Sequence, residues 1–443
     1  MTRYILSRLL WAFPTLFLIS LISFWISNLS ATDPLEKLLR TDAESVSGNT
    51  QLNDDLRKEW QKKLFLDKPA FYFSLQPLAF PDTLQRVVSK GERKVLRKWI
   101  WQSGDWLWVD QLNQLLKAIP LDQTSSQLRR TEDLSQIEAA CLANSEVDNS
   151  QAILAHLAAN PKRIVPLCIP KLHWHGVNNR YHRWAANFLS GDMGYSLTDG
   201  QSISKKIWPK VKISLSISLS AILLSLFIAL PLGLWSGFKP WTARSRATKA
   251  TFIALYSFPS FVVATVLLFL FSNPGVLNIL PGSGLSNPMV YRDSWSIFQK
   301  MAHHLPYLVL PIVSYALVLI AVMGRLVQQS TSELHQTQFI MMARAKGLSD
   351  RKVRNVHALR NVLLPVITLT FGMLPVALGG SVIIETIFSI PGMGREIYRA
   401  MLEQDHNLVV AVFTLVGALT VLGYLLADIF YALADPRIRY SEP

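Results

Sequence analysis

Apolar segments of membrane-spanning length, with few or no charged residues, recur along the chain. The first, 9–28, has no charged residue over about 20 positions, which crosses a ~30 Å hydrocarbon core at 1.5 Å rise per residue. Further apolar segments lie at 211–238, 251–271, 305–324, 362–388 and 408–433. The pattern predicts six transmembrane helices, which places both chain ends on the same side of the membrane.

The first apolar segment has two interpretations. Arg3 and Arg8 precede it, as in a signal peptide. However, its apolar run exceeds the roughly 7–15 residues of a signal-peptide core, and no small-residue cleavage site follows it. We therefore expect an uncleaved signal anchor over residues 1–30 with its N-terminus in the cytoplasm.

The segment 31–209 contains no membrane-length apolar run, so we expect a water-facing region there. Apolar residues recur at three- and four-residue steps over 83–100, 105–118, 135–143 and 150–159, which predicts helices. In the second of these, the predicted apolar face comprises Leu107, Val109, Leu112, Leu115 and Leu116.

Composition and charge support a membrane protein. Half of the residues are hydrophobic, 17% are charged and the formal net charge is +14. With six spans, the basic residues gather on the predicted cytoplasmic side: Arg244, Arg246, Lys249, Arg325, Arg344, Lys346, Arg351, Lys352, Arg354, Arg360, Arg437 and Arg439. The short opposite loops hold only Arg292, Lys300, Arg395 and Arg399. This is the positive-inside bias, so the charge indicates topology rather than nucleic-acid binding.

The two cysteines, Cys141 and Cys168, both lie in the water-facing region. In an oxidising compartment a bridge between them would contribute ~3 kcal/mol. The alternative is two buried thiols that act as small hydrophobic side chains. His173, His175 and His182 lie close in sequence, but they have no carboxylate or cysteine partner nearby, so a polar aromatic stretch at the membrane surface is favoured over a zinc site.

Motifs for catalysis are missing from the sequence. There is no Walker A phosphate loop, no H-E-x-x-H and no G-x-S-x-G pattern. Lys212, Glu385 and Asp428 lie near the ends of predicted spans and are interpreted as interfacial or interhelical polar residues rather than as a proton relay. We expect no catalytic residue, no metal and no cofactor bound by this chain.

The loop between the fourth and fifth spans, about 325–361, has the most informative local pattern. A short helix over 338–346 is expected to stop at Gly347, and Ser349 is expected to cap a second helix that begins with Asp350. Such a helix–glycine–helix unit could fit a groove on a partner protein. A basic amphipathic loop lying on anionic head groups remains the alternative.

Several separated motifs resemble one family. The stretch ARAKGLS (343–349), followed by HALRNVLLPV (357–366), is similar to the coupling loop of permease subunits of ATP-binding-cassette importers in the oligopeptide, dipeptide and nickel group. The segments at 4–24, 66–73, 191–196, 385–394 and 431–439 resemble other recurring stretches of that family, in the family's order.

This resemblance implies an all-α type I importer permease with six transmembrane helices and a helical extracytoplasmic domain after the first span. It implies a second homologous permease subunit, two ATPase subunits that bind ATP and Mg, and an extracytoplasmic substrate-binding protein as partners. The expected location is the inner membrane, with both termini cytoplasmic, residues 31–209 outside and a five-span core over 210–443. The expected coupling residues are Ala343, Arg344, Ala345, Lys346, Gly347, Leu348 and Ser349.

The sequence departs from the family pattern at about 76–178, where a helical insertion separates two family-like motifs. The insertion leaves a second functional class open, namely a membrane-anchored sensor or scaffold that binds an envelope partner. The sequence does not identify the transported solute.

Overall fold

The computed structural model describes residues 2–28 and 59–434, apart from positions 61, 83, 85, 86, 88, 89, 120–126, 144–149, 293, 335 and 336. Positions 29 and 30 of the expected signal anchor, positions 31–58 of the expected extracytoplasmic region and the basic residues Arg437 and Arg439 lie outside the described residues. The chain divides into two compact units. Unit 1 comprises Met1–Ser23 and Ile203–Pro443, and unit 2 comprises Phe24–Ser202.

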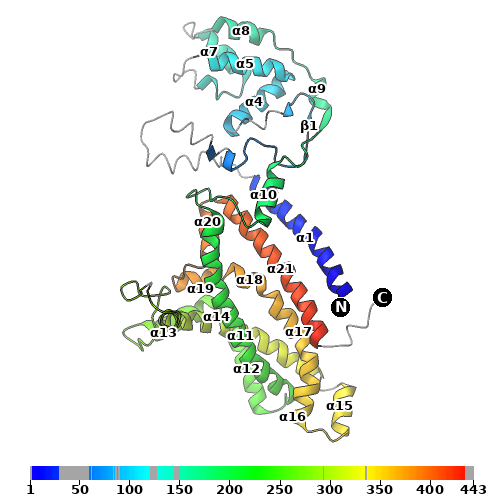
Figure 1. Cartoon of the computed structure of the whole chain (residues 1–443), viewed down its shortest axis with the longest axis vertical. Coiled ribbons are helices and arrows are strands. Elements are labelled where there is room, and N and C mark those ends of the chain that lie inside the picture. Colours follow the sequence, from blue (N-terminus) through cyan, green and yellow to red (C-terminus); the bar gives the residue numbers. More distant parts are fainter. Residues whose placement is uncertain are drawn as a thin grey trace. The chain divides into compact units, whose positions relative to one another are not determined.

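Unit 2 combines a helical core with a two-stranded sheet (Figure 1). Its described elements are β1 (Phe73–Pro77), α4 (Lys90–Ser103), α5 (Trp106–Ala118), α7 (Leu134–Ala143), α8 (Ser150–Ala158), α9 (Val165–Cys168), β2 (Pro170–Trp174) and α10 (Arg180–Leu189). The helices α4, α5, α7 and α8 enclose a core in which Trp99, Leu112 and Ile137 are almost completely buried. Removing such side chains from water is the main favourable contribution to the folding of this unit.

The helices predicted in this region exist. Helices α5, α7 and α8 begin and end within one residue of the expected bounds. The first helix is expected over 83–100, whereas α4 begins at Lys90 and ends at Ser103. The Asp105 side chain caps α5 by accepting the N–H of Leu107 at 3.0 Å. The expectation that Leu107 belongs to the apolar face is wrong, because its side chain is 73% exposed and Trp108 occupies the buried face instead.

The sheet joins residues that are far apart in sequence. Strands β1 and β2 are antiparallel, with Phe73 opposite Trp174 and Pro77 opposite Pro170. Beyond the last pair, the N–H of Leu78 donates to the carbonyl of Ile169 at 2.8 Å. The chain therefore leaves the sheet and returns to it at neighbouring points, and the helical core of unit 2 lies entirely between them.

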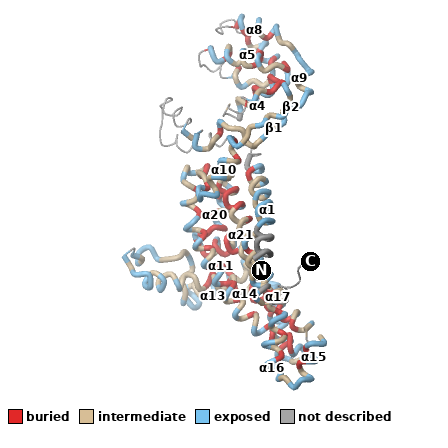
Figure 2. The backbone as a smooth tube through the Cα atoms, turned by 45° about the vertical axis from the view of Figure 1, so that its right-hand side comes forward, coloured by how far each residue is buried: buried red, intermediate tan, exposed pale blue. Residues whose placement is uncertain are grey.

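Unit 1 contains the long apolar helices. After the first helix, α1 (Thr2–Asn28), which unit 1 includes up to Ser23, its elements are α11 (Ile203–Phe238), α12 (Ala243–Ser257), α13 (Ser260–Ser272), α14 (Ile297–Leu334), α15 (Gln338–Ala345), α16 (Asp350–Lys352), a π-helical stretch (Val353–Ala358), α17 (Leu359–Gly372), α18 (Leu374–Gly379), α19 (Val382–Ile387), α20 (Met393–Leu402) and α21 (His406–Ala434). Figure 2 shows buried positions along α11 and α20 and around α15 and α16.

Four helical segments are long and apolar enough to cross a membrane, namely Ile203–Phe238, Ile297–Leu334, Asp350–Ile387 and His406–Tyr431. Helices α12 and α13 meet the same criteria as a pair but are bent by 97° at their junction. The first helix contributes a shorter apolar stretch, Leu10–Ile26. These helices confirm the all-α membrane protein that the sequence predicts, while the total of six spans stays a prediction.

Two of the expected spans are not straight. The third breaks at Pro259, which lacks the N–H needed to continue α12 and lies at the start of α13. The fifth consists of three helices, α17, α18 and α19. One break lies at Met373 and the other at Gly380 and Ser381. Uniform apolar sequence predicted the length of these spans but not their direction.

Candidate coupling loop

The loop between α14 and α17 folds into a helical hairpin at one end of unit 1 (Figure 1). Helix α15 ends at Ala345, and Gly347 has a φ of 78°, a left-handed conformation that costs glycine little. The Ser349 hydroxyl then accepts the N–H of Lys352 at 3.4 Å and caps α16. The structure confirms the predicted helix, its stop at Gly347 and the cap at Ser349.

One face of the hairpin packs against the end of α11. Ile340 and Ala343 of α15 are buried with Phe238, and Val353 and Ala358 complete this cluster. Leu348 packs against it and is half-buried. The hairpin is therefore held to the long helix α11 by apolar contacts rather than by the turn alone.

An ion-pair network reinforces this attachment. The Asp350 carboxylate lies 3.2 Å from Lys239 Nζ and 3.6 Å from Arg344 Nε. The Arg344 guanidinium also lies 4.9 Å from the ring centroid of Phe238. All three charged groups are partly exposed, where single ion pairs contribute about 0–1 kcal/mol, so the network orients the hairpin more than it stabilises it.

The seven expected coupling residues thus divide into two sets. Ala343, Arg344 and Leu348 face the rest of unit 1. Ala345, Lys346, Gly347 and Ser349 are exposed. Of the expected coupling residues, Ala343 does not present its side chain to a partner, because it lies inside the cluster with Ile340.

The structure adds exposed apolar residues that sequence reasoning missed. Phe339, Met341 and Met342 of α15 are 39%, 53% and 58% exposed. Methionine side chains are flexible and polarisable, and they are frequent on surfaces that bind other proteins. Their positions beside the buried Ile340 and Ala343 in a helix could have indicated an outward apolar face.

The hairpin continues into the membrane-length helix without a break. The π-helical stretch Val353–Ala358 connects α16 to α17, and its end residues Val353 and Ala358 are buried. Insertions of this kind often occur at functional positions in helices. The hairpin and α17 are therefore parts of one continuous helical segment.

Polar residues also connect α11 to α19 and α20. Glu385 is 3% exposed and accepts hydrogen bonds from Ser214 Oγ at 2.7 Å and from the N–H of Arg395 at 2.8 Å. A Cβ at Gly392 would lie 2.3 Å from the Glu385 carboxyl carbon, so only glycine leaves room for this carboxylate. The interpretation of Glu385 as an interhelical polar residue is confirmed.

A second carboxylate, Glu396 of α20, pairs with two lysines of α11. Lys206 Nζ lies 3.2 Å from Glu396 Oε1, and Lys210 Nζ contacts Oε2. Burial opposes ionisation, but the hydrogen bonds and charges of Lys210 and Lys206 prevail and lower the pKa of Glu396 below its ordinary value. The pair thus holds the two helices together in the charged state.

The cysteines of unit 2 are free thiols in this structure. Cys141 is buried in the helical core, where burial raises the pKa of its thiol, whereas Cys168 is exposed at the end of α9. The bridge considered from the sequence is not formed here. The alternative of two buried thiols describes Cys141 but not Cys168.

The three histidines near β2 have different neighbours. His175 lies between Ser74 Oγ, at 3.0 Å, and the Asp82 carboxylate, at 3.4 Å. His182 Nδ1 lies 3.1 Å from the Tyr72 hydroxyl, and His173 is on β2 opposite Ser74. Among the described residues no group of three or more histidine, cysteine or acidic side chains is arranged to hold a metal ion.

Comparison with known proteins identifies the family. Residues 229–440 match the family described as binding-protein-dependent transport system inner membrane component. The chain is 32% identical over 263 residues to the oligopeptide transport system permease protein AppB of Bacillus subtilis, an alignment that covers 59% of this chain and 80% of AppB. It is 30% identical over 265 residues to OppB, the corresponding oligopeptide permease of Mycobacterium tuberculosis, with 59% and 80% coverage.

The dipeptide transport system permease protein DppB of Escherichia coli K12 is 27% identical over 277 residues, with 59% of this chain and 81% of DppB covered. The family match includes α14, the hairpin and all helices to α21. The chain therefore belongs to the binding-protein-dependent inner membrane components and is a membrane permease subunit of an ABC importer.

Proposed function

We propose that this chain forms, with a second homologous permease subunit, the translocation path of an importer for peptides or a related small solute. Two ATPase subunits bind ATP and Mg and hydrolyse the nucleotide, and an extracytoplasmic binding protein delivers the solute. The names of the similar proteins, which are oligopeptide and dipeptide permeases, support this cargo class.

The observation that carries the proposal is the two-sided hairpin. Its inner face is fixed to α11 by Phe238, Ile340 and Asp350. Its outer face presents Met341, Met342 and Lys346 to solvent, which suits insertion into a groove of an ATPase subunit with apolar and acidic residues. Movement of the ATPases then rotates α17, as alternating access requires.

The proposed topology places both termini and the hairpin in the cytoplasm, in the inner membrane, with residues 31–209 outside. The bias of basic residues toward the loops 239–249 and 325–360 supports this orientation. A membrane-anchored sensor or scaffold is not favoured, since such a protein would not need an exposed hairpin continuous with a membrane-length helix.

Reconstitution tests the proposal. The complex that contains this chain should be purified with its ATPases, inserted into liposomes and supplied with binding protein and labelled peptides. We expect peptide-dependent stimulation of ATP hydrolysis together with peptide uptake. The variant Met342→Lys should reduce ATPase retention during purification, whereas Met289→Lys, at a methionine outside the hairpin that is even more exposed, should not. Retention of the ATPases by both variants would contradict the docking role of the hairpin.

A further inference from the structure

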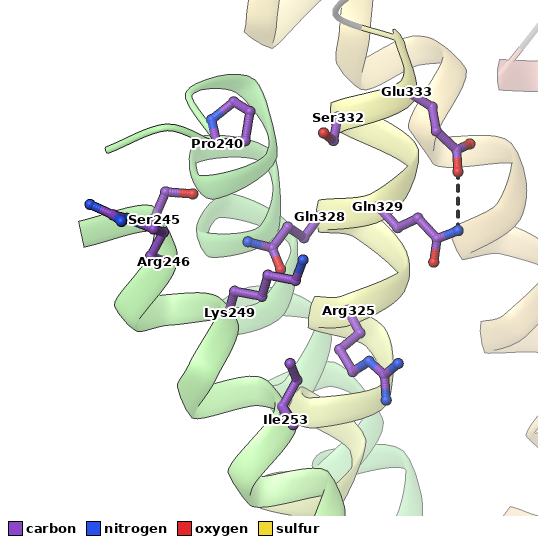
Figure 3. A pocket seen from close by; sticks show the side chains of 10 residues that line it. All are labelled: Pro240, Ser245, Arg246, Lys249, Ile253, Arg325, Gln328, Gln329, Ser332 and Glu333. Carbon is purple, nitrogen blue, oxygen red and sulfur yellow. Dashed lines mark hydrogen bonds between the residues drawn. The ribbon is translucent and has the colours of Figure 1, made fainter. Parts of the chain in front are cut away.

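A cavity of about 410 Å³ opens between α12 and α14 in unit 1 (Figure 3). Its lining comes from residues 245–253 of α12, from the last turns of α14 and from Pro240, which precedes α12. The volume lies within the range of about 300–1,000 Å³ found for small-molecule sites. No residue of the coupling hairpin lines it, so the cavity is separate from the site described above.

The lining is strongly basic. Arg246 and Lys249 of α12 and Arg325 of α14 contribute three cations, and none of them forms an ion pair with a described residue. The one carboxylate of the lining, Glu333, accepts a hydrogen bond from Gln329 at 3.0 Å. Unpaired cations around one cavity favour an anionic ligand, because each attracts negative charge without losing an existing partner.

The cavity also offers polar groups that are suited to a phosphate. Figure 3 shows Lys249 of α12 and Gln328 of α14 pointing toward one another between the two helices. Gln328 is 8% exposed, so its amide forms part of the cavity floor. An ammonium and an amide N–H₂ at this place can both donate to phosphate oxygens.

The position of the cavity along the two helices indicates the source of that phosphate. Phe252 packs against Gly324, where a Cβ would lie 2.5 Å from the Phe252 ring. This crossing marks the boundary between the apolar segments 251–271 and 305–324 and the polar ends of α12 and α14, which hold Arg246, Lys249 and Arg325. The cavity is thus at the depth of the lipid head groups.

Exposed apolar side chains continue from the cavity toward the apolar side of this boundary. Ile253, which lines the cavity, is 44% exposed, and Tyr256 is 55% exposed. The Arg325 guanidinium lies 4.9 Å from the Tyr256 ring centroid and joins the basic and apolar parts. A free phosphate or an acidic protein segment would make no use of this apolar surface, whereas acyl chains would cover it.

We propose that this cavity binds the phosphodiester head group of an anionic phospholipid, with Arg246, Lys249 and Arg325 around the phosphate and the acyl chains along Ile253 and Tyr256. Basic pockets between membrane helices commonly hold anionic head groups. The site is a lipid-binding site of the permease subunit itself and lies outside its translocation and coupling functions.

Native mass spectrometry of the purified transport complex tests this site. After delipidation, the complex should be titrated with phosphatidylglycerol, with phosphatidylcholine of the same acyl chains and with soluble glycerol phosphate. We expect phosphatidylglycerol to bind preferentially and Lys249→Gln/Arg325→Gln to weaken that binding about 30-fold, since each basic residue contributes about 1 kcal/mol. The control Arg244→Gln/Arg292→Gln removes the same charge from exposed positions outside the lining and should bind as the unchanged chain does.

Equal binding of soluble glycerol phosphate and phosphatidylglycerol would overturn the lipid assignment, and equal losses in both double variants would show general surface attraction only. Dissociation of the ATPases from the cavity variant, but not from the control, would assign the cavity to a protein contact instead. If the cavity variant does not assemble, an anionic lipid with a photoreactive acyl chain should crosslink the unchanged complex at α12 near Ile253 and Tyr256. Crosslinks confined to other helices would then reject the site.

Discussion

At the scale of single residues, the hairpin between α14 and α17 depends on one backbone conformation and a few inward contacts. Gly347 has a positive φ and open space around its missing side chain, so a substitution there meets backbone strain but no steric collision within the chain. A side chain at position 347 can therefore act in only two ways: it can strain the turn, or it can change the surface that the hairpin presents to a partner.

We predict that Gly347→Val uncouples ATP hydrolysis from uptake, whereas Gly347→Asn retains most of the uptake. A β-branched residue is a strong outlier at positive φ, while asparagine tolerates the left-handed region at a cost of about 1 kcal/mol or less. Peptide uptake per ATP hydrolysed, measured on liposomes with equal amounts of assembled complex, distinguishes the two. Equal uptake by both variants would show that the turn conformation is irrelevant to coupling.

At the scale of elements, Glu396 links α20 to α11 through Lys206 and Lys210. Because its pKa is lowered in the folded protein, the pair contributes stability that is present above the ordinary carboxyl pKa of 4.5 and is lost as the pH falls through the folded value. The α11–α20 contact should therefore weaken in acid.

The lowered pKa of Glu396 gives a prediction about how thermal stability depends on pH. The melting temperature of the complex should be lower for Glu396→Gln than for the unchanged chain at about pH 6–7, and the difference should shrink as the pH falls below 4.5. Glu333→Gln, at an exposed carboxylate, serves as the control and should show little difference at either pH. A gap between Glu396→Gln and the unchanged chain that stays constant with pH would mean that the ion pair does not contribute.

Unit 2 supports a prediction about its own elements. Because Leu78 and Ile169 are hydrogen-bonded neighbours, residues 79–168 can be replaced by Asn-Gly, the preferred two-residue turn of a β-hairpin. We expect the shortened chain to insert, bind its ATPases and hydrolyse ATP at the basal rate, since the helical core of unit 2 is self-contained. Delivery by the binding protein is expected to weaken.

The readouts for this deletion are complex assembly in detergent and basal ATP hydrolysis. A second deletion that also removes both strands, β1 and β2, is the comparison, because it leaves α10 without the sheet that precedes it. Failure of the first deletion to assemble would mean that the helical core of unit 2 is required for the permease fold.

At the scale of the whole molecule, the proposed orientation can be tested with a native residue. Cys168 is exposed and Cys141 is buried, so a membrane-impermeant maleimide should label the unchanged chain at Cys168 in intact spheroplasts. In a Cys168→Ser background, Lys346→Cys in the hairpin should be labelled only after the membrane is opened. The reverse pattern would place unit 2 in the cytoplasm and contradict the importer orientation.

The sequence by itself determined features that depend on local chemistry. Apolar length predicted the membrane helices, and Gly347 and Ser349 marked helix ends, because capping and left-handed turns involve neighbouring residues. The family motifs were also readable, since they are contiguous strings.

Only the tertiary structure decided which residues of those strings face inward. Ala343 and Arg344 pack toward Phe238, and Leu107 is exposed, because burial depends on what a distant segment places opposite a helix. The same holds for the 97° bend between α12 and α13, for the pairing of Phe73 with Trp174, and for the basic cavity beside Gly324. The strand pairing and the cavity join residues far apart in sequence, and hydrophobic periodicity contains no information on which segments will meet or how sharply a span will bend.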